Sequence, residues 1–369
     1  MLSLSFSTRL KSLHIVPLYT SKCFYKFHLS CFVLNFNIDG VLKNQTILDI
    51  KRPIEADLEK FQDVFESIIS SDAPLLNRVL RYMIRNKGKQ LRPIFVLLSA
   101  KAAHGIVSEK AHVGAALVEI LHSATLIHDD VIDQAEYRRH MFSVPALWKS
   151  KVSILVGDYL LGAGLKLAVD HEAYEMLKEL SLAVEEMSKG ELIQLERSRV
   201  EQYNKEVYLR VIEKKTAALL AAACAIGAQS AEHTHLGSIR QTLYNYGLNL
   251  GMAFQIKDDL FDFGEAEVGK PRGNDLREGK KTLPLILAHH LASPGDRRWL
   301  EKNVRLSRKR SIPRKRTIEY VKKSGAIEAS RQEMLSFAKK AKDALSHLQP
   351  SEALTSLIQL VDYSMERTL

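Results

Sequence analysis

Cysteine is scarce in this chain of 369 residues, which contains only Cys23, Cys31 and Cys224. Three thiols, two of them near the N-terminus, cannot build a disulfide framework or a zinc site, so a reducing compartment and a cytoplasmic location are expected. Glycine and proline are also sparse, at 18 and 10 residues, which argues against a many-turned β fold. No run of about 18 uninterrupted apolar residues occurs, so a membrane-spanning helix is not expected.

Acidic residues are outnumbered, because 43 Asp and Glu residues face 53 Lys and Arg residues and leave a formal net charge of +10. A basic protein can meet nucleic acid, a membrane surface or anionic small molecules. The densest basic stretch, residues 301–323, has only Glu301 and Glu319 as acids. No aromatic ladder accompanies it, so nucleic acid is not an expected partner. We interpret it as a solvated face or loop, with a weak peripheral contact to anionic membrane lipid as the alternative.

The N-terminal residues differ in composition from the rest. Residues 1–38 contain four basic residues and no acid, and they are rich in Ser, Phe and Leu. Such a stretch resembles a transit peptide, which would imply a mitochondrial location. The alternative is that translation begins further downstream. We therefore separate a basic extension, residues 1–45, from one domain, residues 46–369.

From about residue 50 onward the apolar residues recur at steps of three and four, which predicts amphipathic helices. The range 111–133 is apolar on most sides, which is typical of a helix in the protein interior. Further helical ranges are 153–168, 173–194, 207–228, 238–263 and 284–292. The main break, residues 264–283, is rich in glycine and charge and predicts a mobile loop. Few strands are expected, so the fold class is all-α.

An acidic cluster, Asp129, Asp130 and Asp133, follows the apolar range 111–128. On a helix, Asp129 and Asp133 share one face, and their charges repel each other unless a cation lies between them. Carboxylate oxygens suit Mg²⁺, which commonly bridges such groups to substrate phosphates. Taken alone, this motif could still be a coincidence on the surface.

The same spacing returns in a second acidic cluster, Asp258, Asp259 and Asp262, again after an apolar helical range. Two such clusters could face each other across a cavity and hold several metal ions. Clustered divalent ions would offset the charge of a diphosphate and stabilise it as a leaving group. The repeat therefore favours a role for all six aspartates in catalysis.

Cationic residues accompany the two clusters. Arginine can grip phosphate oxygens with two parallel hydrogen bonds, whereas lysine acts as a point charge. A site with two acidic clusters and several cations suits two diphosphates, one held through metal and one held by direct salt bridges. The candidate cations are Lys89, Arg92, Arg138, Arg139, Lys215 and Lys280, and Thr216 lies next to Lys215.

These motifs, in this order, resemble those of the trans-polyprenyl diphosphate synthases from about residue 48 to the C-terminus. The resemblance implies the isoprenoid-synthase fold, a bundle of antiparallel helices around a deep central cavity, and a homodimer. The most specific segments are GKQLRP at 88–93, LIHDDVID at 126–133, GMAFQIKDDLFD at 251–262 and GKPRGNDLREGKKTLP at 269–284.

The resemblance also implies roles for single residues. Asp129, Asp133 and Asp258 would bind several Mg²⁺ ions. Isopentenyl diphosphate would be bound by Lys89, Arg92, His122 and Arg139. The allylic diphosphate would be bound by Arg138, Lys215, Thr216, Gln255 and Lys280. Two departures put the local geometry in doubt: His140 follows Arg139 where the family often has glycine, and Lys257 stands where an apolar residue is frequent.

Product length should follow the depth of an apolar tunnel along the helix before Asp129. Each helical turn rises about 5.4 Å, similar to one isoprene unit. In short-chain relatives a bulky aromatic often lies five residues before the first aspartate, but here that residue is Ala124, and Leu121 lies one turn further back. We expect a product longer than farnesyl. The alternative is that Ala124 is a close-packing residue and that the tunnel ends elsewhere.

Three other interpretations stay open. The pair His128 and Asp129 would suit a metal-dependent phosphohydrolase, but that leaves the second acidic cluster unexplained. A terpene cyclase also uses an acid-rich first motif, yet it has no need of a cationic site for a second diphosphate. A non-catalytic subunit of a heteromeric prenyltransferase could dispense with these acids, and here both clusters are intact.

Overall fold

The computed structural model describes residues 47–86, 88–138, 141–198, 203–230, 236–264 and 273–366. Residues from Asp49 onward belong to one structural unit. The basic extension expected at 1–45 lies outside the described residues, so the transit peptide and the later start both stay predictions.

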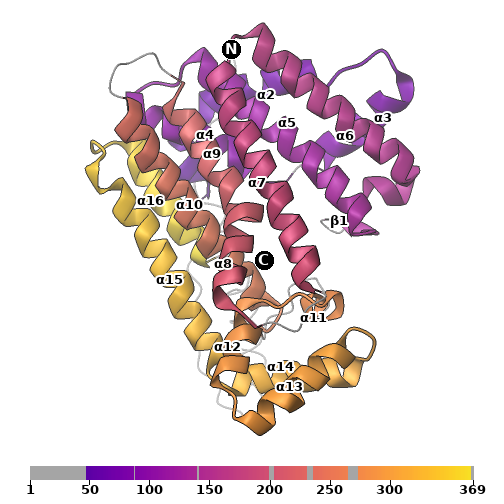
Figure 1. Cartoon of the computed structure of the whole chain (residues 1–369). Helices are drawn as coiled ribbons and strands as arrows, with labels where there is room; N and C mark the ends of the chain where they lie inside the picture. Colours follow the sequence, from indigo (N-terminus) through magenta and orange to yellow (C-terminus); the bar gives the residue numbers. More distant parts are fainter. Residues whose placement is uncertain are drawn as a thin grey trace, which may run out of the picture. The chain divides into compact units, whose positions relative to one another are not determined.

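The described residues are almost entirely helical (Figure 1). The α-helices are α2 (Glu55–Ile68), α3 (Pro74–Arg85), α4 (Leu91–His104), α5 (Glu109–Ile132), α6 (Val144–Asp170), α7 (Tyr174–Ser198), α8 (Lys205–Ile212), α9 (Ala218–Ala228), α10 (Leu236–Phe261), α11 (Asn274–Glu278), α12 (Leu283–Leu291), α13 (Pro294–Ser307), α14 (Ser311–Lys323), α15 (Ala326–Ala344) and α16 (Glu352–Glu366). Short helical turns are η1 (Arg52–Ile54), η2 (Glu213–Ala217) and η3 (Leu345–His347). Two-residue strands, β1 (Tyr137–Arg138) and β2 (Met141–Phe142), pair antiparallel. The all-α prediction is confirmed.

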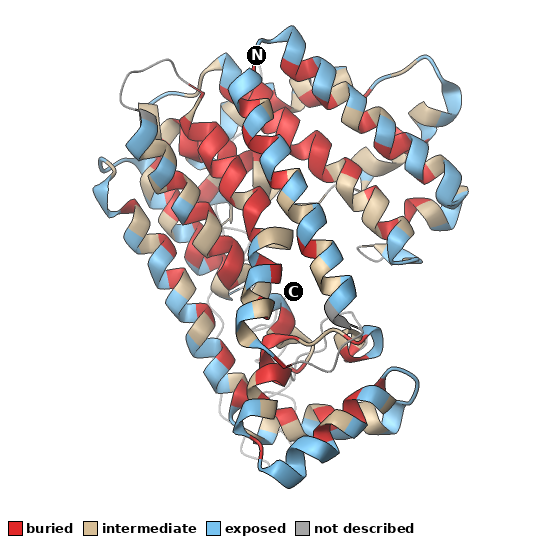
Figure 2. Ribbon diagram, in the orientation of Figure 1, coloured by how far each residue is buried: buried red, intermediate tan, exposed pale blue. Residues whose placement is uncertain are grey.

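Helix α5 lies in the interior, as its sequence predicts. Ser108 caps its first turn, since the Ser108 hydroxyl accepts a hydrogen bond from the backbone N–H of Ala111. The helix is buried along most of its length and packs against α2, α4, α6 and α9 (Figure 2). A helix that is apolar on most sides is stable only where neighbours cover every face. This packing fixes the position of the aspartates at its C-terminal end.

Helix α10 carries the second acidic cluster and is equally enclosed. It packs between α9 and α15. The fully buried Tyr246 donates its hydroxyl to the Leu357 carbonyl of α16 at 2.7 Å, which satisfies the one polar group of this large side chain. The two helices that end in aspartates are therefore both anchored by the core.

Helix α6 combines a buried face with an exposed apolar face. Gly157 and Gly164 let it approach α5, because a methyl group at Gly157 would collide with the His128 ring. The opposite face exposes Ile154, Leu155 and other large apolar side chains. Within the described residues, α6 is the one helix that is long and apolar enough to cross a membrane by length and composition.

The predicted break at 264–283 contains a short helix, α11, between Gly273 and Gly279. Both glycines have positive φ, near 76° and 80°, a conformation that other residues adopt only with strain. They start and stop α11 within one turn and turn the chain back toward α10. Residues 265–272 lie outside the described residues, so the mobile loop stays a prediction for that part.

Candidate active site

The three aspartates of the first cluster have different surroundings at the end of α5. Asp130 is buried, and its carboxylate accepts hydrogen bonds from Arg138 Nε at 2.7 and 2.8 Å. Asp133 is exposed at the helix C-terminus and Asp129 is partly buried. The carboxylates of Asp129 and Asp133 are therefore the ones available to a ligand, while the carboxylate of Asp130 positions Arg138 on strand β1.

The second cluster repeats this division at the end of α10. Asp258 is exposed and Asp259 is buried. Asp262 differs from its counterpart Asp133, because its two oxygens accept hydrogen bonds from the backbone N–H groups of Asn274 at 2.9 Å and Asp275 at 3.2 Å. Asp262 thus caps α11 and holds that helix against the end of α10.

A chain of hydrogen bonds holds Asp259 in place. Tyr208 of α8 donates to Asp259 Oδ2 at 2.6 Å, and Gln255 Nε2 donates to Asp259 Oδ1 at 2.9 Å. Thr216 in turn donates to Gln255 Oε1 at 2.7 Å. Burial, together with the nearby Asp275 charge, raises the pKa of Asp259 to about 8. The network therefore fixes the rotamers of Gln255 and Thr216 beside Asp258.

Lys215 and Thr216 lie on η2, a turn of π-helix between α8 and α9. Single π-helical turns occur often at functional sites, because they turn side chains away from the regular helical register. Two glycines let neighbouring helices approach this turn. A methyl group at Gly190 of α7 would lie 2.8 Å from the backbone nitrogen of Lys215, and one at Gly251 of α10 would lie 2.6 Å from Ala217 Cα. The turn is therefore packed tightly between α7 and α10.

Two lysines connect the acidic clusters. Lys215 lines the same cavity as Asp259 and exerts an electrostatic effect on Asp129, the first aspartate of the other cluster. Lys280, directly after α11, lines this cavity too and feels the charge of Asp133. The second cluster therefore borders a cationic cavity through Asp259, and the charges of Lys215 and Lys280 link this cavity to the first cluster.

The pKa shifts in this cavity reflect burial first and neighbouring charges second. Burial raises the pKa of Asp129, and Lys215 opposes that shift. Burial lowers the pKa of Lys280, but the Glu278 carboxylate at 2.6 Å, with Asp275 and Asp133, outweighs this effect and raises it. Lys280 is therefore fully charged at neutral pH, as a diphosphate ligand must be.

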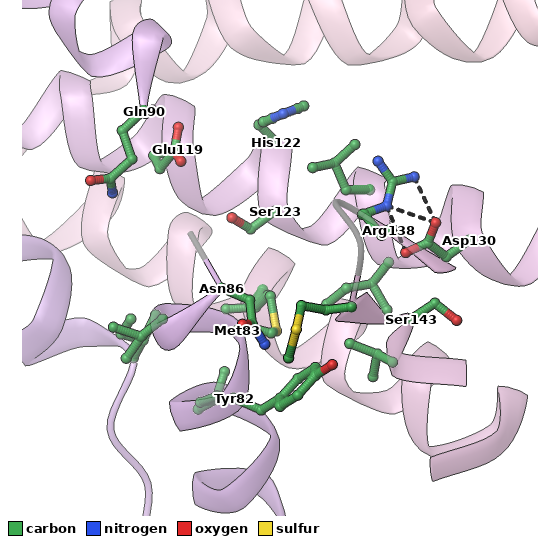
Figure 3. A pocket seen from close by; sticks show the side chains of 18 of the residues that line it. Tyr82, Met83, Asn86, Gln90, Glu119, His122, Ser123, Asp130, Arg138 and Ser143 are labelled. Carbon is green, nitrogen blue, oxygen red and sulfur yellow. Dashed lines mark hydrogen bonds and ion pairs between the residues drawn. The ribbon is translucent and has the colours of Figure 1, made fainter. Parts of the chain in front are cut away.

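A second cavity lies between α3, the start of α4, α5 and the β-hairpin (Figure 3). His122 and Ser123 of α5 line one side, and Tyr82 and Met83 of α3 line the other. Arg138 borders it while bound to Asp130. Most of its lining is apolar, which suits a small hydrocarbon group close to one or two cations.

The lysines of two predicted motifs are held by the last helix, α16. Lys89 Nζ donates to the hydroxyl of the buried Tyr363 at 2.7 Å and lies 5.3 Å from the centre of its ring. Lys257 donates to the carbonyl of Met365. Lys257, the departure noted in the second motif, thus has a structural partner at the C-terminal end of the chain.

The remaining predicted residues are located as follows. Arg92 is partly buried in the first turn of α4. Ala124 is fully buried, and Leu121 is nearly so and lies near Gly164 of α6. His128 Nε2 lies 3.3 Å from the Ile154 carbonyl, a structural contact to α6. Arg139 lies outside the described residues.

Several residues at the site were not predicted from the sequence. Glu191 of α7 forms an ion pair with Lys215, and Gln194 lines the same cavity. Both lie in the segment GELIQLE, and their separation of three residues, which puts them on one helical face, was the available signal. Tyr208 and Asp275 carried no signal, because their importance depends on contacts to α10.

The sequence of this chain is similar to those of known proteins. The model of the Polyprenyl synthetase family matches residues 73–321. The heptaprenyl diphosphate synthase component 2 of Bacillus subtilis (strain 168) is 34% identical over 314 residues, which cover 84% of this chain and 88% of that protein. The octaprenyl diphosphate synthase of Escherichia coli (strain K12) is 34% identical over 303 residues, covering 81% and 92%.

Solved structures give the same result for the fold. A polyprenyl synthase from Caulobacter crescentus CB15, complexed with calcium and isoprenyl diphosphate, superimposes with a TM-score of 0.80 at 34% identity, covering 86% of this chain and 97% of that one. A decaprenyl diphosphate synthase from Rhodobacter capsulatus also gives a TM-score of 0.80, at 33% identity, covering 86% and 98%.

Proposed function

Because this chain belongs to the polyprenyl synthetase family, we propose that it joins isopentenyl diphosphate to an allylic diphosphate and makes a linear polyprenyl diphosphate. The predicted family, isoprenoid-synthase fold and enzyme class, a transferase of prenyl groups, are confirmed by these relatives. The observation that carries the proposal is that Lys215 and Lys280 line a cavity beside Asp259 of the second cluster and interact electrostatically with Asp129 and Asp133 of the first.

The acidic residues suit divalent metal that arrives with a diphosphate. Within the described part of the chain, no three His, Cys, Asp or Glu side chains lie close enough together to hold an ion by themselves. Mg²⁺ commonly takes one or two carboxylates and completes its shell with water and substrate phosphates. Asp129, Asp133 and Asp258 would supply those carboxylates, and the bound ions would neutralise charge on the leaving diphosphate. The calcium and isoprenyl diphosphate in the Caulobacter structure support this assignment.

The reaction needs a strong leaving group and a dry cavity. The allylic carbon–oxygen bond breaks, and diphosphate leaves with the electron pair. The double bond of isopentenyl diphosphate then attacks the allylic cation, and a proton passes to the departed diphosphate. Lys215, Thr216 and Lys280 would hold the leaving diphosphate, and positive charge fixed in advance stabilises it at no cost in reorganisation. The apolar walls exclude water from the cation.

The isopentenyl substrate suits the cavity of Figure 3. His122 and Arg138 border it, Lys89 precedes α4 and Arg92 lies in the first turn of α4. A five-carbon group would be covered by Met83, Leu126 and the other apolar residues of that cavity wall. Direct salt bridges from Lys89 and Arg92 would hold its diphosphate without metal.

A product longer than farnesyl is supported by the small side chain at Ala124. The helix around Ala124 carries no aromatic residue that could end a tunnel there: its neighbours from residue 113 to residue 128 are aliphatic, small or polar. The relatives named for seven- and eight-unit products point in the same direction. The tunnel would then pass α5 toward residue Val113.

A homodimer is supported by the exposed face of α6. Ile154, Leu155, Leu165 and Val169 are large apolar residues on one side of this helix, and Leu155 is 58% exposed. Exposed apolar faces of this kind mark protein interfaces. Light scattering after size exclusion should give twice the chain mass, and Leu155→Glu should give the single mass. A wild-type monomer would contradict the dimer.

The test of the reaction is an assay of the purified chain alone. Incubation with labelled isopentenyl diphosphate, farnesyl diphosphate and Mg²⁺ should yield condensed prenyl diphosphates by mass spectrometry, and chelation should stop the reaction. Release of phosphate without condensation would favour the phosphohydrolase instead. Because the Bacillus relative is named as one component, an inactive chain that gains activity with a second protein would identify a heteromeric enzyme.

A further inference from the structure

The helical hairpin α13–α14 holds nearly all the excess positive charge of the chain. Residues 294–323 contain twelve Lys and Arg residues and three acids, a difference of nine, whereas the whole chain has a formal net charge of +10. The rest of the protein is thus close to neutral. Positive charge that is concentrated on a single hairpin is typical of a surface that binds an anionic partner.

The acids of the hairpin do not neutralise this charge. Glu301 forms an ion pair with His289 at 2.8 Å, and Asp296 accepts a hydrogen bond from the hydroxyl of Ser293 at 2.8 Å. Among the described residues, eight exposed cations of the hairpin form no ion pair with a carboxylate: Arg298, Lys302, Arg305, Lys309, Arg310, Lys315, Arg316 and Lys323. On α15, by contrast, Lys339 pairs with Asp343 at 2.6 Å.

Large apolar residues stand among these cations. Ile312 is 65% exposed at the start of α14, between Arg310 and Arg314. Trp299 of α13 is 36% exposed and lies 5.4 Å from the Tyr320 ring. Cations that surround an exposed aliphatic side chain and a half-exposed indole suit the boundary between lipid headgroups and acyl chains. A nucleic acid would instead need free aromatic faces on which bases could stack.

The hairpin also rests on the segment that forms the active site. The Arg314 side chain occupies the space where a methyl group of Gly273 would lie, and Arg308 does the same at Gly279. These glycines bracket α11, and Lys280 follows directly. The lower part of Figure 1 shows α13 and α14 beside α11, and Figure 2 shows their exposed outer surface. The basic surface therefore lies next to the wall of the cationic cavity.

The geometry points to the outer face of α13–α14 as a docking surface for an anionic phospholipid bilayer. Lys309, Arg310, Lys315 and Arg316 attract the headgroups, and Ile312 enters the interface. Such contact goes beyond the proposed reaction and would place the enzyme where its product belongs, because a polyprenyl tail is stabilised when its methylene groups leave water for the bilayer.

The test is co-sedimentation of the full chain with vesicles, without any isoprenoid substrate. Wild-type protein should bind vesicles of phosphatidylcholine with 30% phosphatidylglycerol (roughly the anionic fraction that gives a strong surface potential) and should not bind pure phosphatidylcholine. The variant with Lys309, Arg310, Lys315 and Arg316 all replaced by glutamine should bind at least about tenfold more weakly, since each charge near the surface contributes several-fold.

A matched control removes the same number of charges elsewhere. Lysines 166, 178, 339 and 340 are exposed on α6, α7 and α15, and their replacement by glutamine lowers the net charge equally. This variant should bind as wild type does. Equal weakening in both variants would overturn the inference, because net charge alone would then explain the binding.

Three other results would also overturn it: equal binding to neutral vesicles, an unchanged affinity of the hairpin variant, or hairpin-dependent binding of single-stranded RNA in place of vesicles. Ile312→Ser should weaken vesicle binding by several-fold and leave the salt dependence intact. Prenyl transfer in detergent separates this inference from the proposed function: the hairpin variant should keep wild-type turnover there while losing the vesicles. Circular dichroism checks that each variant is folded.

Discussion

The two acidic clusters share one spacing but differ in how many carboxylates they offer to a ligand. In each, the middle aspartate is buried and bound by a side chain: Asp130 by Arg138, and Asp259 by Tyr208 and Gln255. The last aspartates differ, since Asp133 is exposed whereas Asp262 caps α11. The comparison teaches that spacing sets which side chains share a face, while neighbours decide which carboxylates are available.

The largest loss of activity is expected when the first aspartate of either cluster is replaced. Asp129→Ala and Asp258→Ala should each lower kcat/KM by about a thousandfold or more, because each removes charge that holds the metal and the leaving diphosphate. Radiolabel incorporation at saturating Mg²⁺ measures this. Asp262→Asn should cost much less, because an amide oxygen can still accept a hydrogen bond from α11. Equal losses in all three variants would break the comparison.

Lys215 should rank next, because it is the cation that links the second cluster's cavity to Asp129. Lys215→Gln should lower kcat by about a hundredfold, in the range found for the loss of one charge-stabilising group. The matched control is Lys214→Gln, because Lys214 lies on the same turn but pairs with Glu186 of α7. If both variants lost activity equally, the effect would come from the folding of η2 and not from the charge at the cavity.

Product length should respond to Ala124. Ala124→Phe should place an aromatic ring across the proposed tunnel and shift the main product shorter by several isoprene units, each about as long as the 5.4 Å rise of one helical turn. Reversed-phase chromatography of the dephosphorylated products measures the shift. Ala124→Leu is the graded control. An unchanged product in both variants would mean that the tunnel ends elsewhere.

The buried middle aspartate of the second cluster should make stability depend on pH. Burial raises the pKa of Asp259 to about 8, so its protonated form stabilises the fold at low pH and this stabilisation is lost as the pH rises toward that value. In metal-free buffer, the Tm of wild type should therefore fall relative to Asp259→Asn between about pH 4 and pH 8. If Tm varied with pH in the same way for wild type and Asp259→Asn, the pKa of Asp259 would not be raised.

The smallest effect is expected at Tyr363, which positions Lys89 from the far end of the chain. Tyr363→Phe removes one hydrogen bond and keeps the ring, so the KM for isopentenyl diphosphate should rise about threefold to tenfold. The KM for the allylic substrate should stay unchanged. An equal rise in both constants would indicate a general disturbance of α16.

The sequence predicted the helices and the two clusters because both depend on local periodicity. The range 111–133 became α5 to within two residues at its start, and the two DDxxD motifs ended their helices as expected. Contacts between residues far apart in the sequence could not be predicted. Lys89 and Tyr363 are 274 positions apart, and Tyr208 and Asp259 are 51 apart, so no spacing rule connects them. The π-helical turn at η2 also could not be predicted, because it depends on the close approach of α7 at Gly190 and α10 at Gly251.

The most direct test of the account is a double-mutant cycle on metal-dependent binding of an unreactive allylic thiodiphosphate, with Asp129→Asn, Asp258→Asn and the double variant. If both clusters hold the same diphosphate through shared ions, the two losses in binding free energy should be coupled by more than about 1 kcal/mol. Losses that add within about 0.5 kcal/mol would show two independent sites and would contradict the single assembly.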